Sequence, residues 1–234
     1  MEFEGQTVLI TGAAGNLGQA VAKAFGARGA NLVLIDLKHE ALARAFSRDS
    51  KTQFLAATNL LDQAQVNETV TKAADRFGRI DVLCNIAGGF RMGEAVHETS
   101  DATWNFLFDI NARTLLHAVR AVVPRMLTAR SGKIINVGAF AAQRGAPRMG
   151  VYTAAKSVVI RLTEAMAAEL RNNGINVNCV LPTIIDTPEN RAAMPDADAN
   201  RWVAPADLAS TILFLASPAA RAIHGAALPV SGLS

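Results

Sequence analysis

The sequence of 234 residues has little cysteine, few aromatic residues and no long apolar run. Its two cysteines, Cys84 and Cys179, lie in strand-like runs, so we expect buried free thiols in a reducing compartment rather than a disulfide. No apolar stretch approaches the roughly 20 residues that cross a bilayer, which argues against a membrane protein. The acidic segment Met1–Glu4 lacks the pattern of a signal peptide, and a cytoplasmic location is therefore expected.

Charge of one sign is also scarce. The 23 Lys and Arg residues are nearly balanced by 20 Asp and Glu residues, and this balance does not predict nucleic-acid binding. The four histidines lack metal-ligand spacing, so no metal site is predicted. Tyrosine is the rarest aromatic residue: Tyr152 stands alone beside ten Phe and two Trp. A lone phenol in such a chain suggests that its hydroxyl has a function.

The chain alternates between short apolar runs and longer segments of helical period. Half of the residues are hydrophobic, enough for a large core. Buried strands are predicted at Thr7–Thr11, Leu32–Ile35, Val82–Cys84, Ile134–Val137, Ile175–Leu181 and Ala226–Val230. Helices are predicted at Leu17–Arg28, Asp62–Phe77, Asp101–Met126, Val151–Asn172 and Pro205–Ala216. This alternation predicts a doubly wound α/β Rossmann fold, a parallel sheet with helices on both faces.

Neither repeats nor polar linkers interrupt this pattern, so residues 1–234 are predicted to form a single dinucleotide-binding and catalytic domain. The least regular stretch is Pro182–Ala204, which contains three prolines. A loop of this length in a compact domain usually has a function. We therefore expect residues 183–204 to act as a lid over the substrate.

A glycine-rich turn, Thr11–Gly18, follows the first strand and opens the first helix. Glycines allow the backbone to approach a pyrophosphate, and the helix N-terminus offers free N–H groups to it. Asp36 ends the second strand, where a carboxylate accepts hydrogen bonds from an adenosine ribose and repels a 2′-phosphate. NAD(H) is therefore favoured over NADP(H), although the nearby Lys38 can weaken this preference. A helix-capping role for Asp36 is the alternative, and the two roles are compatible.

Tyr152 and Lys156 are four residues apart and share one face of a predicted helix. An adjacent ammonium group favours the phenolate, so we expect the pKa of Tyr152 to fall below the usual value of about 10. The hydroxyl then exchanges protons near neutral pH. The alternative interpretation is an amphipathic surface pair without chemistry.

Together these motifs resemble the short-chain dehydrogenase/reductase family, from about Thr7 to the C-terminus. The resemblance is carried by the Thr11–Gly18 turn, the Tyr152/Lys156 pair and three further segments: Asn85-Ile86-Ala87-Gly88, Asp109-Ile110-Asn111-Ala112 and Pro182–Thr187. It implies seven strands in the order 3-2-1-4-5-6-7 and assembly as a homotetramer or homodimer. It also implies hydride transfer between NAD(P)(H) and a small carbonyl or alcohol substrate.

Residue roles follow from the same resemblance. Tyr152 would exchange a proton with the substrate, and Lys156 would hold the nicotinamide ribose and lower the Tyr152 pKa. Asn111 would anchor a water molecule that extends the proton relay. Cofactor contacts are expected from Tyr152 and Lys156 and from Gly12, Gly15, Asn16, Leu17, Gly18, Asp36, Asn59, Leu60, Asn85, Ala87, Gly88, Pro182, Ile185 and Thr187.

Two departures from the family pattern affect the expected chemistry. Asn16 replaces the middle glycine of the turn, although Asn tolerates left-handed backbone better than other side chains do. Ala139 stands thirteen residues before Tyr152, where the family has a serine that donates a hydrogen bond to the reacting oxygen. Removing such a donor costs roughly 10²–10³ in rate. Gln143 and Arg144 are the candidate replacements.

Ala139 leaves two further hypotheses open. The segments Gly138–Ala142 and Met194–Asp198, followed by Trp202, resemble dihydropteridine reductase, a family member that also has alanine there. Adding hydride to a conjugated C=N system creates no alkoxide, so the serine is less needed. Alternatively, the protein is a catalytically weak NAD-binding sensor or scaffold, but the intact Tyr152 and Lys156 favour an enzyme. Four residues are candidate walls of the substrate pocket: Phe90, Phe140, Met194 and Trp202.

Overall fold

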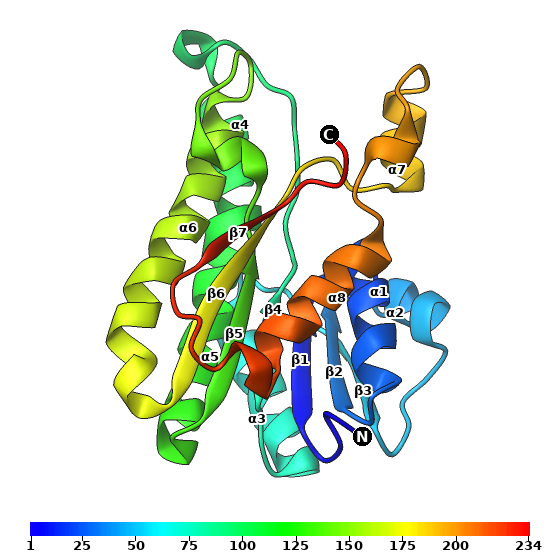
Figure 1. Ribbon diagram of the computed structural model, residues 1–234, viewed down its shortest axis with the longest axis vertical. Helices are drawn as coiled ribbons and strands as arrows, with labels where there is room; N and C mark the ends of the chain where they lie inside the picture. The colour runs from blue at the N-terminus through cyan, green and yellow to red at the C-terminus, as the bar shows by residue number, and fades with distance from the viewer.

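Seven parallel strands form a sheet between two layers of helices in the computed structural model, which describes residues 1–234 (Figure 1). The strand order is β3-β2-β1-β4-β5-β6-β7, as the family resemblance implied. The strands are β1 (Thr7–Thr11), β2 (Asn31–Asp36), β3 (Gln53–Ala57), β4 (Val82–Asn85), β5 (Gly132–Val137), β6 (Ile175–Pro182) and β7 (Ala227–Val230). The predicted doubly wound α/β fold is therefore confirmed.

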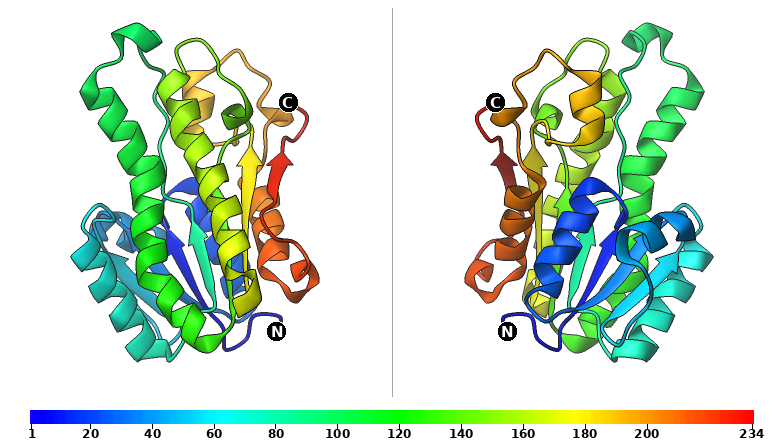
Figure 2. Two further views of the ribbon diagram at one scale, coloured as in Figure 1. Left: turned by 90° about the vertical axis from the view of Figure 1, so that its left-hand side faces the viewer. Right: turned by 90° about the vertical axis from the view of Figure 1, so that its right-hand side faces the viewer.

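Helices cover both faces of this sheet (Figures 1 and 2). One layer contains α1 (Asn16–Gly26), α2 (His39–Phe46) and α8 (Pro205–Ala216), and the other contains α3 (Gln63–Phe77), α5 (Thr114–Ala129) and α6 (Gly150–Leu170). Val8 and Ile10 of β1 pack into the first layer, while Leu9 between them packs into the second. Successive side chains of a strand point to opposite faces, so a strand buried on both faces is mostly apolar along its length.

Local sequence explains where several helices begin and end. The Asp62 side chain accepts hydrogen bonds from the backbone N–H groups of Ala64 and Gln65 and so caps α3. Pro205 occupies the first turn of α8, as predicted, since proline needs no hydrogen-bond acceptor there. Gly174 has φ +73° and ends the α6 region in the left-handed conformation.

The structure differs from the sequence-based prediction in three places. The helix predicted over Asp101–Met126 is divided by a π-helical turn at Asp109–Arg113, between α4 (Asp101–Phe108) and α5. Strand β3 and helix α2 escape the prediction because both are short and less apolar than the central strands. The irregular stretch after β6 contains a short helix, α7 (Pro188–Ala193), which Thr187 caps. None of these differences changes the order of the strands or the two layers of helices.

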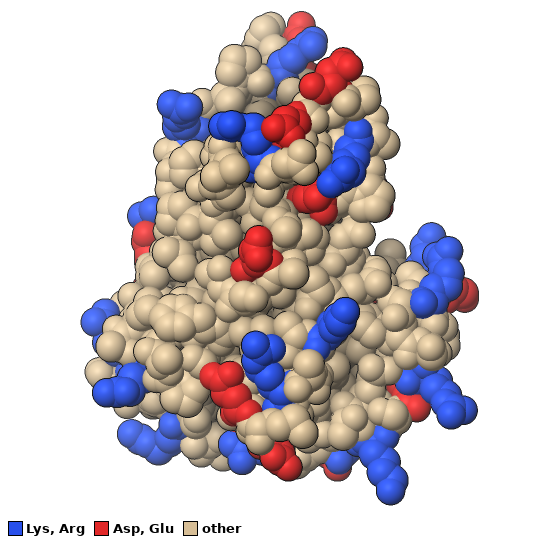
Figure 3. Space-filling model, turned by 45° about the vertical axis from the view of Figure 1, so that its right-hand side comes forward, with Lys and Arg blue, Asp and Glu red and all other residues tan.

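Two features of the structure concern membrane crossing and surface charge. None of the helices has the combination of length and apolar character that membrane crossing requires. On the face seen in Figure 3, basic and acidic side chains are interspersed, without a large field of one sign. The near balance of charge in the sequence therefore also holds locally on that face.

Candidate active site

An open cleft of about 1450 Å³ lies beyond the carboxyl ends of the central strands. Its walls come from the segments that follow β1 to β6 and from α6 (Gly150–Leu170). The strand order reverses between β1 and β4, and open α/β sheets bind ligands at such a switch point. Ordinary small-molecule pockets measure roughly 300–1,000 Å³. The cleft therefore has room for a dinucleotide and a second molecule.

Most of the residues predicted to contact a cofactor line this cleft. The predicted residues found in its walls are Gly12, Gly15, Asn16, Leu17, Gly18, Asp36, Asn59, Leu60, Ala87, Gly88, Tyr152, Lys156, Pro182, Ile185 and Thr187. The side chain of Asn85 lies behind the wall instead, because its Nδ2 donates to Asn136 Oδ1 at 2.9 Å. Asn85 therefore joins β4 to β5 beneath the cleft.

Two positions in the glycine-rich turn, Gly12 and Gly18, have no space for a side chain, because backbone atoms lie too close.

 A Cβ atom on Gly12 would lie 2.9 Å from the backbone of Ala87, and one on Gly18 would collide with the Gly12 carbonyl. Thr11 Oγ1 fixes the other side of the turn, since it accepts hydrogen bonds from the N–H groups of Ile86 (3.0 Å) and Ala87 (3.1 Å). The turn and the segment after β4 are therefore held in close contact.

The first turn of α1 offers hydrogen-bond donors to the cleft. Its N-cap residue, Gly15, has no side chain to accept from the helix. The backbone N–H groups of Asn16, Leu17 and Gly18 donate to no backbone acceptor, and all three residues line the cleft. Free N–H groups and the positive end of the helix dipole suit a phosphate group. A dinucleotide diphosphate therefore fits this turn.

Asp36 lies at the end of β2 and lines the same part of the cleft. Its carboxylate accepts hydrogen bonds from the N–H groups of Ala14 (3.0 Å) and Leu37 (2.8 Å). These bonds hold the carboxylate beside the turn, and its oxygens retain further acceptor capacity. The alternative capping role is wrong, because Lys38 is the N-cap residue of α2 and no side chain caps that helix. Lys38 itself does not line the cleft.

Tyr152 and Lys156 lie on α6 and both line the cleft. The Tyr152 ring packs edge-to-face against Phe90, with ring centroids 4.9 Å apart. Burial raises the pKa of Tyr152 to about 12. The expected lowering of this pKa is therefore wrong, because burial disfavours the charged phenolate.

Lys156 is 5% exposed, and its Nζ donates to the Val137 carbonyl at 2.9 Å. No carboxylate forms an ion pair with it. Burial therefore lowers the pKa of Lys156 to about 8, from an ordinary value of 10.5. An amine with such a pKa exchanges protons near neutral pH.

Asn111 lies on the π-helical turn and is 2% exposed. Its Nδ2 donates to the carbonyls of Gly89 (2.9 Å) and Leu107 (3.0 Å), and its Oδ1 accepts from the Gly89 N–H (3.1 Å). A Cβ atom on Gly88 would lie 2.9 Å from Asn111 Oδ1 and 3.0 Å from Lys156 Nζ. Asn111 therefore positions the backbone that separates it from Lys156.

The predicted substrate walls are largely found where the sequence placed them. Phe90, Phe140 and Met194 line the cleft, whereas Trp202 does not and is 8% exposed. Ala139 lines the cleft as well, so the position of the family serine faces it without a hydroxyl group. Its two candidate replacements, Gln143 and Arg144, are also among the lining residues.

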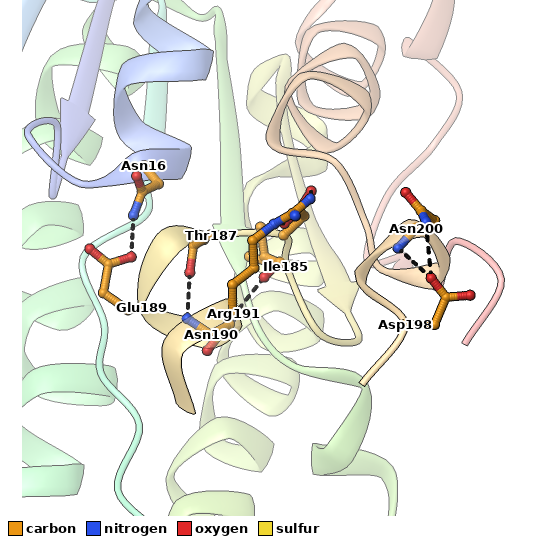
Figure 4. Close-up of polar contacts among 9 residues, drawn as sticks. Asn16, Ile185, Thr187, Glu189, Asn190, Arg191, Asp198 and Asn200 are labelled. Carbon is orange, nitrogen blue, oxygen red and sulfur yellow. Dashed lines mark hydrogen bonds and ion pairs between the residues drawn. The ribbon is translucent and has the colours of Figure 1, made fainter. Parts of the chain in front are cut away.

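The predicted lid segment is organised by hydrogen bonds, shown in Figure 4. Thr187 Oγ1 accepts from the Asn190 N–H at 3.2 Å, and Asn190 Nδ2 donates to the Ile185 carbonyl at 2.8 Å. Asn16 Nδ2 of α1 donates to Glu189 Oε2 of α7 at 2.8 Å, across 173 residues of sequence. Asn16, which stands where the family has a glycine, therefore links the glycine-rich turn to the predicted lid segment. Asn190 also lines the cleft, and no sequence signal indicated it.

Comparison with known proteins identifies the family. The family model described as short chain dehydrogenase matches residues 6–198. The chain is 32% identical over 244 residues to the 3-oxoacyl-[acyl-carrier-protein] reductase FabG of Thermotoga maritima, covering 99% of this chain and 98% of that protein. The chain therefore belongs to the short-chain dehydrogenase family, and it is an oxidoreductase of that family.

Solved structures agree with this assignment. NAD⁺-bound xylitol dehydrogenase superposes with a TM-score of 0.89 at 25% identity, covering 99% of this chain and 100% of that chain. ElxO with NADP bound superposes with a TM-score of 0.89 at 26% identity, covering 97% of each chain. The neighbours thus bind either NAD or NADP, and a nicotinamide dinucleotide is the cofactor class for this fold.

Proposed function

We propose that the protein transfers hydride between NAD(H) and a small carbonyl or alcohol substrate, with Tyr152 as the proton donor or acceptor. One observation carries this proposal. Tyr152 and Lys156 line the same cleft as the glycine-rich turn and the acidic residue Asp36, which suit a diphosphate and a ribose diol. A cleft with these two ends suits a bound dinucleotide whose reactive end lies beside an acid–base pair.

The cofactor would be held mainly by backbone groups. The N–H groups of Asn16, Leu17 and Gly18 suit the diphosphate, and the Asp36 carboxylate suits the adenosine ribose. A 2′-phosphate beside Asp36 would meet like charge, and Lys38 lies outside the cleft. These two facts support a preference for NAD(H) over NADP(H).

The acid–base chemistry would belong to Tyr152 and Lys156. When bound, the nicotinamide supplies or accepts the hydride. Tyr152 keeps its proton at neutral pH, since its pKa is about 12, and is therefore in the state needed to protonate a substrate that is being reduced. Lys156, with a pKa of about 8, can hold or pass a proton beside it. Asn111 would act by keeping the Gly88–Gly89 backbone in place against Lys156.

The lid segment would close the substrate half of the cleft. Ile185, Thr187 and Met194 all line the cleft, and the contact between Asn16 and Glu189 holds α7 against the phosphate-binding turn. Binding of the diphosphate at this turn would therefore be coupled to the position of the lid.

Ala139 supports a second candidate function, the reduction of a conjugated C=N substrate such as a quinonoid dihydropterin. Such a reduction leaves no alkoxide, so the missing hydroxyl at position 139 would cost little. The carbonyl reaction instead requires another donor, for which Gln143 and Arg144 are placed in the cleft wall.

A substrate screen tests both candidates. NADH and NADPH are each supplied with ketones, 3-oxoacyl thioesters and quinonoid dihydropterin, and oxidation of the cofactor is followed by its absorbance. Turnover of a ketone or thioester supports the first candidate, and turnover of the pterin alone supports the second. Tight cofactor binding without turnover of any compound would contradict both and would indicate a sensor or scaffold.

A further inference from the structure

The substrate half of the cleft has an unusual balance of charge. Only three charged side chains line the whole cleft: Asp36, Lys156 and Arg144. Asp36 belongs to the adenosine end, and Lys156 is buried beside Tyr152. Arg144 is therefore the one exposed charge in the substrate half, and no acidic side chain lines that half.

The Arg144 guanidinium has no acidic partner within the protein. It takes part in none of the nine ion pairs of the structure. Its residue directly follows the short helix Phe140–Gln143, which begins next to Ala139. The cleft wall also includes the apolar Phe90, Phe140 and Met194, together with the uncharged polar Gln143 and Asn190. An unpaired cation thus borders a largely apolar space that has no acidic side chain in its substrate half.

The other arginines of this region are placed differently. The Arg91 guanidinium lies over the Phe106 ring, 4.3 Å from its centroid. Arg148 does not line the cleft, and its carbonyl accepts a hydrogen bond from the Gly93 N–H at 2.9 Å. Arg144 is therefore the arginine that a molecule in the cleft would meet.

We propose that Arg144 is a specificity-determining residue and that the substrate is an anion. The substrate would combine an apolar body, a group that Tyr152 can protonate, and a carboxylate or phosphate that pairs with Arg144. A guanidinium group binds either anion through two parallel hydrogen bonds. The inference rests on the proposed oxidoreductase function and names its substrate class. It also distinguishes the two candidate functions, because a neutral dihydropterin gains nothing from this arginine.

The test uses the NADH complex of the protein and three probes with one common body. The probes are 4-acetylbenzoate, its methyl ester and 4-acetylphenyl phosphate, and their binding is followed by the fluorescence of bound NADH. We expect each anion that fits to bind about tenfold more tightly than the ester, as a charge-assisted hydrogen bond allows. Tighter binding of 4-acetylbenzoate would indicate a carboxylate in the substrate, and tighter binding of 4-acetylphenyl phosphate would indicate a phosphate. Added salt should reduce the preference, since Arg144 is exposed.

Two variants separate the role of Arg144 from a general effect of positive charge. Arg144→Gln should abolish the preference for the anions, whereas Arg148→Gln, four residues further along and outside the cleft, should keep it. Equal binding of anions and ester by the wild type, binding of no probe, or an unchanged preference in Arg144→Gln would overturn the inference. Anion-selective binding without turnover of any carbonyl or conjugated C=N compound would support the inference and contradict the proposed function. Failure to bind NADH would contradict both.

Discussion

The buried Lys156 makes a testable contribution to stability. Its pKa falls from 10.5 in water to about 8 in the folded protein. Between these two pH values the unfolded chain binds a proton that the folded protein does not bind, so the free energy of unfolding rises with pH. Below about pH 8 both states carry the charge and the full cost of burying it is present. The difference between the two pKa values corresponds to roughly 3 kcal/mol.

Lys156→Met removes the ammonium group and keeps most of the side-chain volume. It also deprives the Val137 carbonyl of a donor, which costs about 1–3 kcal/mol. We therefore expect the variant to be as stable as the wild type or more stable near neutral pH, by up to about 2 kcal/mol. From about pH 8 to pH 10 the wild type should gain on the variant by about 1.4 kcal/mol for each pH unit.

Urea unfolding without cofactor measures this difference, followed by the fluorescence of Trp104 and Trp202 at fixed protein concentration. Comparing the two proteins cancels the effects of Tyr152 and Cys84, whose burial raises their pKa values and lowers stability at alkaline pH. Lys72→Met removes an ammonium group at an exposed position and serves as the control for a general effect of charge. A constant difference between wild type and Lys156→Met from neutral to alkaline pH would refute the reasoning.

Three further predictions concern the cofactor, the lid and the missing serine. Because the Asp36 carboxylate should repel a 2′-phosphate, calorimetry should show tighter binding of NAD(H) than of NADP(H). Asp36→Ala should reduce this difference in affinity. Equal affinities of the wild type for the two cofactors would contradict this role of Asp36. Asn16→Gly removes the hydrogen bond to Glu189 and should speed cofactor dissociation about fivefold, as one hydrogen bond of about 1 kcal/mol allows. Glu189→Ala should do the same, and the double variant should be no faster than either; additive effects would show that the contact does not operate. If the substrate needs no hydroxyl at position 139, Ala139→Ser should not raise kcat/KM on the true substrate. A large gain confined to ordinary ketones would instead indicate a weakened carbonyl reductase.

The central strands of the sheet can be predicted from sequence patterns, whereas the edge strand β3 and the π-helical turn cannot. Strands β1 and β6 are buried along their whole length and are mostly apolar, and such runs are visible in a sequence. Strand β3 lies at the sheet edge and is only partly buried, so its apolar run is harder to recognise in the sequence. The π-helical turn at Asp109–Arg113 has hydrogen bonds that span one more residue than those of an α-helix. A search for helical periodicity does not detect so small a difference. The order of the strands came from the family resemblance rather than from the pattern itself.

The candidate site divides in a similar way. Glycine spacing and the four-residue separation of Tyr152 and Lys156 are local, so the sequence displays them. The pKa of Tyr152 was predicted in the wrong direction because it depends on burial, which spacing along a helix does not report. The contact between Asn16 and Glu189 and the place of Arg144 in the cleft wall depend on distant segments that meet only in the folded chain.

The central claim is that Tyr152 moves the proton in a nicotinamide-dependent reaction. The most direct measurement compares the wild type with Tyr152→Phe on the best substrate of the screen, following NADH oxidation and, separately, NADH affinity. We expect the variant to lose turnover and to keep nearly the same affinity for NADH, because Phe preserves the packing against Phe90 and removes only the hydroxyl. A Tyr152→Phe variant that turns over the substrate as fast as the wild type would contradict it.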